Sequence, residues 1–179
     1  MFAVQRPKDI QTERLILSVL MPDEIEALLA GDARYVERAS GFRYPPDDPN
    51  RGIDFNWHLR ALRTDPNQLP WRIRVIVERS SNTVIGSINL KGPPDEDGDV
   101  EFGWGLNEDA RGKGYATEAA AAVLEWAFQP PGVRSVSATI LDDNLVSQRV
   151  AQRLGLTRTN ATRKERPLWK CERTTARIS

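Results

Sequence analysis

The sequence feature that most constrains the fold is the glycine-rich segment 107–117, which has the sequence N-E-D-A-R-G-K-G-Y-A-T. It follows a strand-like stretch, 100–106, and precedes residues 116–128, whose apolar positions recur at the spacing of a helix buried along one face. Backbone N–H groups in the first turn of a helix lack intrahelical partners and lie at the positive end of its dipole. This context predicts an anion site, because a glycine-rich entry lets phosphate oxygens approach those donors.

Two cations, Arg111 and Lys113, lie in the same segment and favour the anion site. A bare G-x-G pattern more often marks a tight turn, so the flanking strand, helix and cations carry the interpretation. The segment is neither a G-x-G-x-x-G dinucleotide fingerprint nor a phosphate loop that ends in Gly-Lys-Ser/Thr. Nicotinamide and ATP chemistry are therefore not supported.

Composition excludes several other classes. The 179 residues suit one domain, 1–179, and 25 basic residues balance 25 acidic ones, so no net charge draws the chain to nucleic acid or anionic lipid. One histidine, His58, and one cysteine, Cys171, argue against a metal site and exclude an intramolecular disulfide. Without a membrane-length apolar run or a secretion signal, we expect a cytoplasmic protein.

Hydrophobic periodicity predicts an α/β or α+β domain with one core and helices on both faces of a mixed sheet. Residues 71–77 and 84–90 are expected to pair as an antiparallel hairpin, and the proline-rich segment 41–50 to form a loop. The other expected strands are 15–17, 100–106, 133–141, 156–162 and 167–175, and the expected helices are 22–29, 32–39, 53–62, 116–128 and 145–154.

The segment Arg111-Gly112-Lys113-Gly114-Tyr115-Ala116 fits the pattern Q/R-x-x-G-x-G/A, and here the chain resembles the GNAT superfamily of acyl-CoA-dependent N-acetyltransferases. Three further stretches resemble the RimJ/RimL-like branch of that superfamily in order. They are the opening T-E-R-L-I-L at 12–17, the strand 100–106, and the second CoA segment from 143–147 to 154–156. The resemblance extends over about residues 12 to 172.

This resemblance implies a single GNAT domain whose mostly antiparallel sheet of about seven strands is splayed. Acetyl-CoA, as co-substrate, would lie between the fourth and fifth strands, with its pyrophosphate on the amides of the glycine-rich segment. The pantetheine arm would meet the backbone of 104–106 and the side chain of Asn144. The implied cofactor-binding residues are Trp104, Gly105, Leu106, Arg111, Gly112, Lys113, Gly114, Tyr115, Ala116, Thr117, Asn144 and Ser147.

Amine acetylation requires a base for the acceptor's ammonium, and Glu101 matches the position where many GNAT members keep that carboxylate. The alternative for Glu101 is a structural ion pair with a nearby arginine. Glu165 is a second candidate by the resemblance, although its neighbours Arg163, Lys164 and Arg166 favour a solvated charge run.

The usual thiolate-protonating tyrosine of the superfamily is replaced here by Ala151. The branch instead has a serine three residues after the motif asparagine, so Ser147 becomes the candidate acid, with a place in the first turn of a helix as the alternative. Asn144 is the better N-cap. We expect a backbone N–H freed by a bulge at Gly103-Trp104 to polarise the thioester carbonyl, unless the glycines only relieve crowding.

The resemblance puts the wall of the acceptor pocket near Phe42, Tyr44, Trp57 and Arg60. Apolar periodicity assigns Trp57 to the core, and His58 falls on the opposite, surface face of the same helix. The basic tail 158–177 is interpreted as a solvated face near the cofactor's phosphates.

The resulting hypothesis is an acetyl-CoA-dependent N-acetyltransferase acting on a primary amine, either a protein N-terminus or a small molecule, as a monomer or homodimer. The alternative is a non-catalytic acyl-CoA-binding or regulatory module, which the alanine at 151 favours. An RNA-binding domain without chemistry rests on the basic tail alone and is the weakest interpretation.

Overall fold

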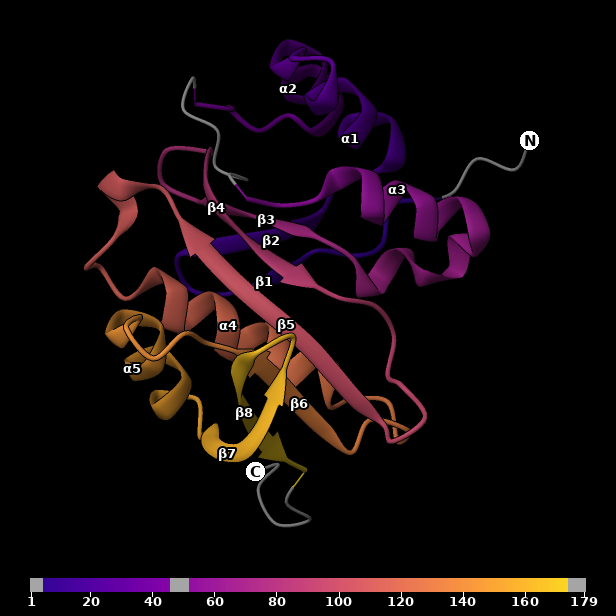
Figure 1. Ribbon diagram of the computed structural model, residues 1–179. Helices are drawn as coiled ribbons and strands as arrows, with labels where there is room; N and C mark the ends of the chain where they lie inside the picture. The colour runs from indigo at the N-terminus through magenta and orange to yellow at the C-terminus, as the bar shows by residue number, and fades with distance from the viewer. Residues whose placement is uncertain (1–4, 46–51, 174–179) are drawn as a thin grey trace.

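The computed structural model describes residues 5–45 and 52–173, which form one eight-stranded sheet in the order β1-β2-β3-β4-β5-β6-β8-β7 (Figure 1). The strands are β1 (Ile10–Gln11), β2 (Leu15–Val19), β3 (Arg74–Glu78), β4 (Thr83–Leu90), β5 (Asp99–Leu106), β6 (Ser135–Thr139), β7 (Thr157–Arg163) and β8 (Arg166–Glu172). Within this described part, neighbouring strands are antiparallel except β5 and β6, which run parallel. The mixed, mostly antiparallel sheet is confirmed.

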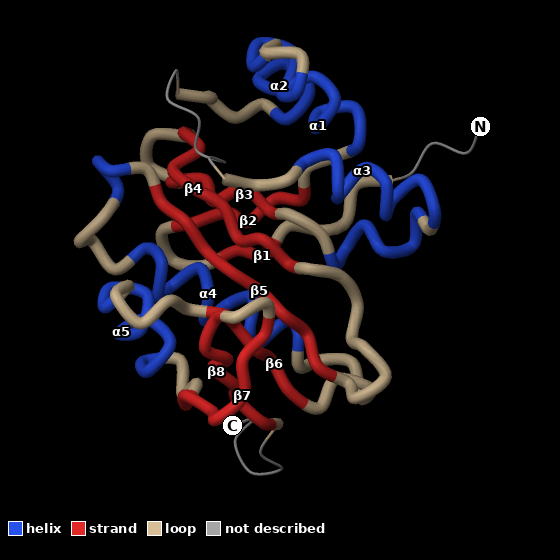
Figure 2. Tube along the Cα trace, viewed as in Figure 1, coloured by secondary structure: helices blue, strands red, loops and turns tan. Residues whose placement is uncertain are grey.

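Within residues 5–45 and 52–173, five α-helices connect and cover the strands (Figure 2). They are α1 (Pro22–Leu29), α2 (Ala33–Ser40), α3 (Phe55–Thr64), α4 (Tyr115–Ala127) and α5 (Leu145–Arg153). Two short 3₁₀ helices, Pro66–Trp71 and Glu108–Ala110, precede β3 and α4. None of the helices in this part of the chain has the length and apolar character needed to cross a bilayer.

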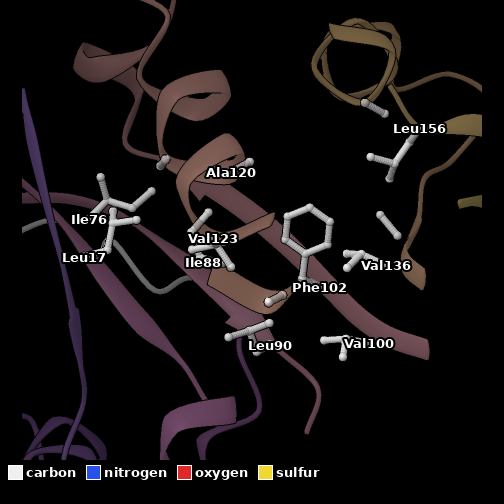
Figure 3. Packing of buried hydrophobic residues seen from close by; sticks show 14 of the residues in the cluster. Leu17, Ile76, Ile88, Leu90, Val100, Phe102, Ala120, Val123, Val136 and Leu156 are labelled. Carbon is white, nitrogen blue, oxygen red and sulfur yellow. The ribbon is translucent and has the colours of Figure 1, made fainter. Parts of the chain in front are cut away.

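Hydrophobic side chains form two clusters, one on each face of the sheet. Along β3, Ile76 belongs to one cluster and Val75 and Val77 to the other, because successive side chains of a strand point to opposite faces. The first cluster lies between the sheet and α4, where Ala120 and Val123 contribute (Figure 3). The second packs beneath α1, α2 and α3. Helices on both faces are thereby confirmed.

Several expected elements differ at their bounds. Residues 66–71 form a 3₁₀ helix where the first hairpin strand was expected to begin, because Asp65 caps that turn by accepting from the N–H of Asn67. The strand expected at 133–141 is shorter, Ser135–Thr139, and the two-residue strand β1 had no recognisable pattern. Of the loop predicted at 41–50, residues 46–50 lie outside the described residues, as do the last residues of the basic tail.

Candidate active site

The parallel strands β5 and β6 separate after a short paired stretch. Their pairing ends at Glu101 and Ser137, whereas β5 continues to Leu106. Beyond this point lies a hollow of about 140 Å³ between the two strands and the start of α5. It is lined by Gly103, Trp104, Ala138, Thr139, Ile140, Leu141, Asn144, Ser147 and Arg166. The structure thus brings three predicted site residues, Trp104, Asn144 and Ser147, to one cleft.

Beyond Glu101, no strand of the described part of the chain pairs with β5 on the side that faces β6. The N–H of Lys91 on the β4 side donates to the C=O of Glu101 at 2.9 Å. Hydrogen-bonded pairs recur at every second residue of an antiparallel ladder, so Gly103 also directs its backbone groups toward β4. The backbone groups of Trp104 and Leu106 therefore face the cleft side, where they can meet a bound arm.

The prediction of a bulge at Gly103-Trp104 is wrong. The register of β4 with β5 runs without interruption from Gly86 opposite Leu106 to Leu90 opposite Phe102. Register shifts lie instead between β3 and β4, at Ile76 and Val77, and between β7 and β8, at 158–162. Cleft-facing N–H groups arise because β6 diverges from β5, so no bulge is needed to free them.

The glycine-rich segment forms the entry to α4, as expected from the sequence. Gly112 and Gly114 have φ of 75° and 82°, which a glycine adopts without strain. Gly114 is the N-cap, no side chain caps the helix, and the N–H of Glu118 makes a 3.1 Å bond to the C=O of Gly114. The N–H groups of 115–117 thus have no intrahelical acceptor. A Cβ added at Gly112 would meet nothing within 4 Å, so the cradle is open enough for a phosphate.

The side chains of this loop differ in their exposure to solvent. Arg111 and Lys113 are exposed, and the Nε of Arg111 donates to the C=O of Leu106 at 3.2 Å, which joins the loop to the end of β5. Tyr115 is buried and donates its hydroxyl hydrogen to Glu78 Oε1 at 2.6 Å. Only the backbone of Tyr115 is therefore available to an anion at the loop.

Glu101 lies at the point where β5 and β6 separate and takes part in a charged cluster. Its Oε2 is 2.7 Å from Nη1 of Arg163, and its Oε1 is 3.4 Å from Oγ1 of Thr139, a residue of the cleft wall. Arg163 also lies 3.3 Å from the buried carboxylate of Asp99, and the hydrogen bond to Glu101 is the main cause of its raised pKa. The arginine partner foreseen as the alternative for Glu101 is present.

The N-terminus of α5 holds the other catalytic candidate. Asn144 Oδ1 accepts from the backbone N–H of Ser147 at 3.1 Å, so Asn144 is the N-cap as expected. The Ser147 side chain is half-buried on the cleft wall and is not needed for that cap. Ala151, where many GNAT enzymes have tyrosine, is fully buried in the core.

Two expectations for α3 are wrong. His58 is buried, with 1% of its surface exposed, and its Nε2 lies 2.8 Å from Asn89 Oδ1 on β4, opposite Gly103. Trp57 is 37% exposed and covers the guanidinium of Arg72 at 4.7 Å. The helix is rotated so that the imidazole meets a polar side chain of the sheet, which compensates part of its burial. Burial lowers the pKa of His58 to about 4.

Glu165, the second candidate base, lies with Lys164 in the turn between β7 and β8. Both residues have positive φ, 63° and 51°, and both are exposed. The solvated position favoured by the charge run is confirmed for these side chains.

Arg163, Thr139 and Arg166 were not identified as site residues from the sequence. Arg163 and Arg166 are opposite each other in the β7-β8 pair, and Arg166 lines the cleft. The R-K-E-R run was interpreted as a solvated face, and only its alternation within a hairpin could have indicated that Arg163 points inward.

Comparison with known proteins agrees with this geometry. Residues 14–157 match the Acetyltransferase (GNAT) domain family. The chain is similar to the uncharacterized N-acetyltransferase YjdG of Bacillus subtilis, with 36% identity over 81 residues. This match spans 45% of the chain and about half, 48%, of that curated relative.

Solved structures share the fold. The ribosomal-protein-S5-alanine acetyltransferase of Vibrio fischeri superimposes with a TM-score of 0.65 at 15% identity, covering 93% of this chain and 97% of that one. The microcin C7 self-immunity acetyltransferase MccE, solved with acetyl-CoA and AMP, gives a TM-score of 0.59 at 13% identity, covering 90% and 93%. The family match over most of the chain, on this splayed sheet, shows that the protein belongs to the GNAT acetyltransferase family.

Proposed function

We propose that the protein is an acetyl-CoA-dependent N-acetyltransferase of the RimJ/RimL-like branch that transfers acetyl to a primary amine. The observation that carries this proposal is that the cleft and the glycine-rich loop are connected along the chain. The cleft between β5 and β6 presents the backbone N–H groups of Trp104 and Leu106, and the open amides of 115–117 lie in the first turn of α4, after the loop that follows β5. Together they suit a ligand with a thin polar arm and an anionic end.

Each part of acetyl-CoA would meet a different part of this site. The αL glycines at 112 and 114 leave room for the pyrophosphate, and Arg111 and Lys113 add positive charge at the exposed end. The cleft-facing amides of Trp104 and Leu106 would bond the pantetheine arm, with Asn144 and Ser147 on the opposite wall. Acetyl-CoA supplies an activated acetyl group as a thioester.

Three side chains near the point where β5 and β6 separate would take part in the acetyl transfer. Glu101 would accept the proton of the acceptor's ammonium, directly or through water. Arg163, 2.7 Å from that carboxylate, would hold it in position beside the acceptor. Ser147 would donate a proton to the departing thiolate.

A non-catalytic acyl-CoA-binding module is the second candidate, and two observations favour it. Glu101 is engaged by Arg163, and the position of the usual acid tyrosine is a buried alanine. Such a module would bind acetyl-CoA and leave an amine unmodified.

The test combines binding with turnover. Calorimetry with acetyl-CoA measures the first, and thiol release with a panel of N-terminal peptides and small-molecule amines measures the second. Acetyl-CoA at a hundredfold excess over its dissociation constant should raise the stability of the fold by about 2.7 kcal/mol. Binding with amine-dependent thiol release supports the enzyme, and binding without release from any acceptor supports the module. Absence of binding would overturn both.

A further inference from the structure

An arginine far from the glycine-rich segment in sequence lies directly against it in space. Nη1 of Arg14 donates to the C=O of Lys113 at 3.0 Å, across 99 residues of chain. A Cβ built on Gly114 would lie 3.5 Å from Nη2 of the same guanidinium. Arg14 therefore lies against the peptide bond that leads into the N-cap of α4.

Glu118, in the first turn of α4, holds Arg14 in this position. The Nε and Nη2 atoms of Arg14 lie 2.7 and 2.6 Å from Glu118 Oε2, which is a two-pronged charge-assisted contact. The other carboxylate oxygen, Oε1, accepts from the backbone N–H of Arg14 at 3.0 Å and from the Thr12 hydroxyl at 2.6 Å. Burial raises the pKa of Glu118, but these hydrogen bonds outweigh it and leave the pKa lowered.

A second contact fixes the same helical turn through Tyr115. The Tyr115 hydroxyl donates to Glu78 on β3 at 2.6 Å, and Glu78 also accepts from Ser81 at 2.6 Å. The guanidinium of Arg14 stacks 4.5 Å from the centre of the Tyr115 ring. The first turn of α4 is thus tied to the turn between β1 and β2 through Glu118 and to β3 through Tyr115.

These contacts act on a segment with little stiffness of its own. Gly112 and Gly114 lose more backbone freedom on ordering than any other residue type would, so a loop built on them is costly to hold in one conformation. Fixing the C=O of Lys113 sets the orientation of the peptide that precedes the N-cap, and with it the direction of the amides at 115–117. When the loop is already ordered before binding, the ligand does not lose binding free energy in ordering it.

We propose that Arg14, anchored by Glu118, is a positioning residue that pre-orders the loop for the pyrophosphate of acetyl-CoA. The inference rests on the proposed function, because it assigns the pyrophosphate to that loop. It adds Arg14, which lies in the turn between β1 and β2 and outside the glycine-rich motif, to the residues that determine affinity for the co-substrate.

The test compares two acetyl donors in wild type and in Arg14→Ala. Calorimetry should show a dissociation constant for acetyl-CoA about 10-fold to 100-fold higher in the variant, the range for losing a charge-assisted contact. The kcat/KM for S-acetylpantetheine, which has the same arm and thioester but no pyrophosphate, should stay within about twofold of wild type. Arg79→Ala is the matched control, since Arg79, which follows β3, donates to the C=O of Thr12 at 2.8 Å in the turn that also carries Arg14. Its affinity for acetyl-CoA should stay at the wild-type value.

Glu118→Gln tests the anchor separately. The double variant Arg14→Ala/Glu118→Gln should bind acetyl-CoA about as weakly as Arg14→Ala alone, because the two residues act as a unit. Additive losses would overturn the proposal, as would unchanged affinity in Arg14→Ala or equal losses with both donors. If wild type itself does not bind acetyl-CoA, the proposed function fails instead, and the two failures are therefore distinguishable.

Discussion

Nη1 of Arg163 on β7 lies 2.7 Å from Oε2 of Glu101 on β5, at the position where β5 and β6 cease to pair. The same guanidinium reaches Asp99, which also accepts from the hydroxyls of Ser135 and Ser137 at 2.7 and 2.5 Å. The β7-β8 pair is thereby fastened to the strand that carries the candidate base. A carboxylate in this position can serve as a base or hold the hairpin, and the two roles are separable by experiment.

If Glu101 is the base, Glu101→Gln should lower turnover by about two to four orders of magnitude at neutral pH, the usual range for a general base. The loss should be smaller at high pH, where more of the acceptor is already a free amine. Turnover against pH for wild type and variant, with an acceptor identified from the amine panel, checks this. Glu165→Gln, a change at the exposed turn, is the control and should retain activity. Wild-type turnover in Glu101→Gln would assign the base to Glu165 or to solvent.

If Glu101 mainly holds the hairpin, urea unfolding gives a different result. Glu101→Gln and Arg163→Met should then each lower the free energy of unfolding, and the double variant should lose little more than the worse single one, because the pair is shared. Turnover in Arg163→Met should remain comparable to turnover in Glu101→Gln. A large gap between those two rates would contradict a purely structural pair.

Ser147→Ala should slow turnover without rescue at high pH, because raising the pH does not supply a proton to the departing thiolate. The fold should be unaffected, since the cap on α5 uses only the backbone N–H of residue 147. Asn144→Ala is the informative comparison. It removes that cap and should cost about 1 kcal/mol of stability. Melting temperature and turnover measured together distinguish the two effects, and pH rescue of Ser147→Ala would exclude the proton-donor role.

Gly114→Val should abolish acetyl-CoA binding, because a branched side chain 3.5 Å from the Arg14 guanidinium would displace that residue and crowd the loop that receives the pyrophosphate. The φ of 82° at this glycine adds about 1–2 kcal/mol of backbone strain, so some loss of stability is expected as well. Gly41→Val is the matched control. Gly41 has a φ of 79° and open space around its Cβ position, but it ends α2, outside the cleft wall and the glycine-rich loop. Calorimetry should show normal acetyl-CoA binding in Gly41→Val. An equal loss of binding in both variants would mean that the substitutions act by destabilising the fold.

His58 should make stability depend on pH in a defined window. Burial lowers its pKa to about 4, from about 6.5 in an unfolded chain, so the unfolded state binds the proton first as pH falls. Wild type is then fully stabilised above pH 6.5 and should lose roughly 2 kcal/mol between pH 7 and pH 5 from this residue. His58→Gln, whose amide can still reach Asn89, should not show this loss of about 2 kcal/mol when its urea unfolding is measured at the two pH values. Parallel pH profiles for the two proteins would contradict the buried imidazole.

Local patterns in the sequence predicted the elements whose determinants lie within one or two turns of chain. The apolar spacing of 116–128 predicted α4, Gly155 with its φ of 81° ended α5, and the apolar stretches around the turn at 80–82 predicted the hairpin of β3 and β4. The glycine motif between strand and helix indicated the open amides at 115–117. The family resemblance, which depends on such segments in order, was confirmed by the match over 14–157.

Tertiary structure decided which side chains meet. Arg14 and Glu118 are 104 residues apart in sequence, and Arg163 and Glu101 are 62 apart, so neither contact has a local signal. His58 was misplaced because helical periodicity describes one apolar stripe, whereas a polar partner on the sheet, Asn89, makes burial of an imidazole acceptable. The open edge of β5 came from the divergence of β6, a property of two strands together, which the sequence of β5 alone does not contain.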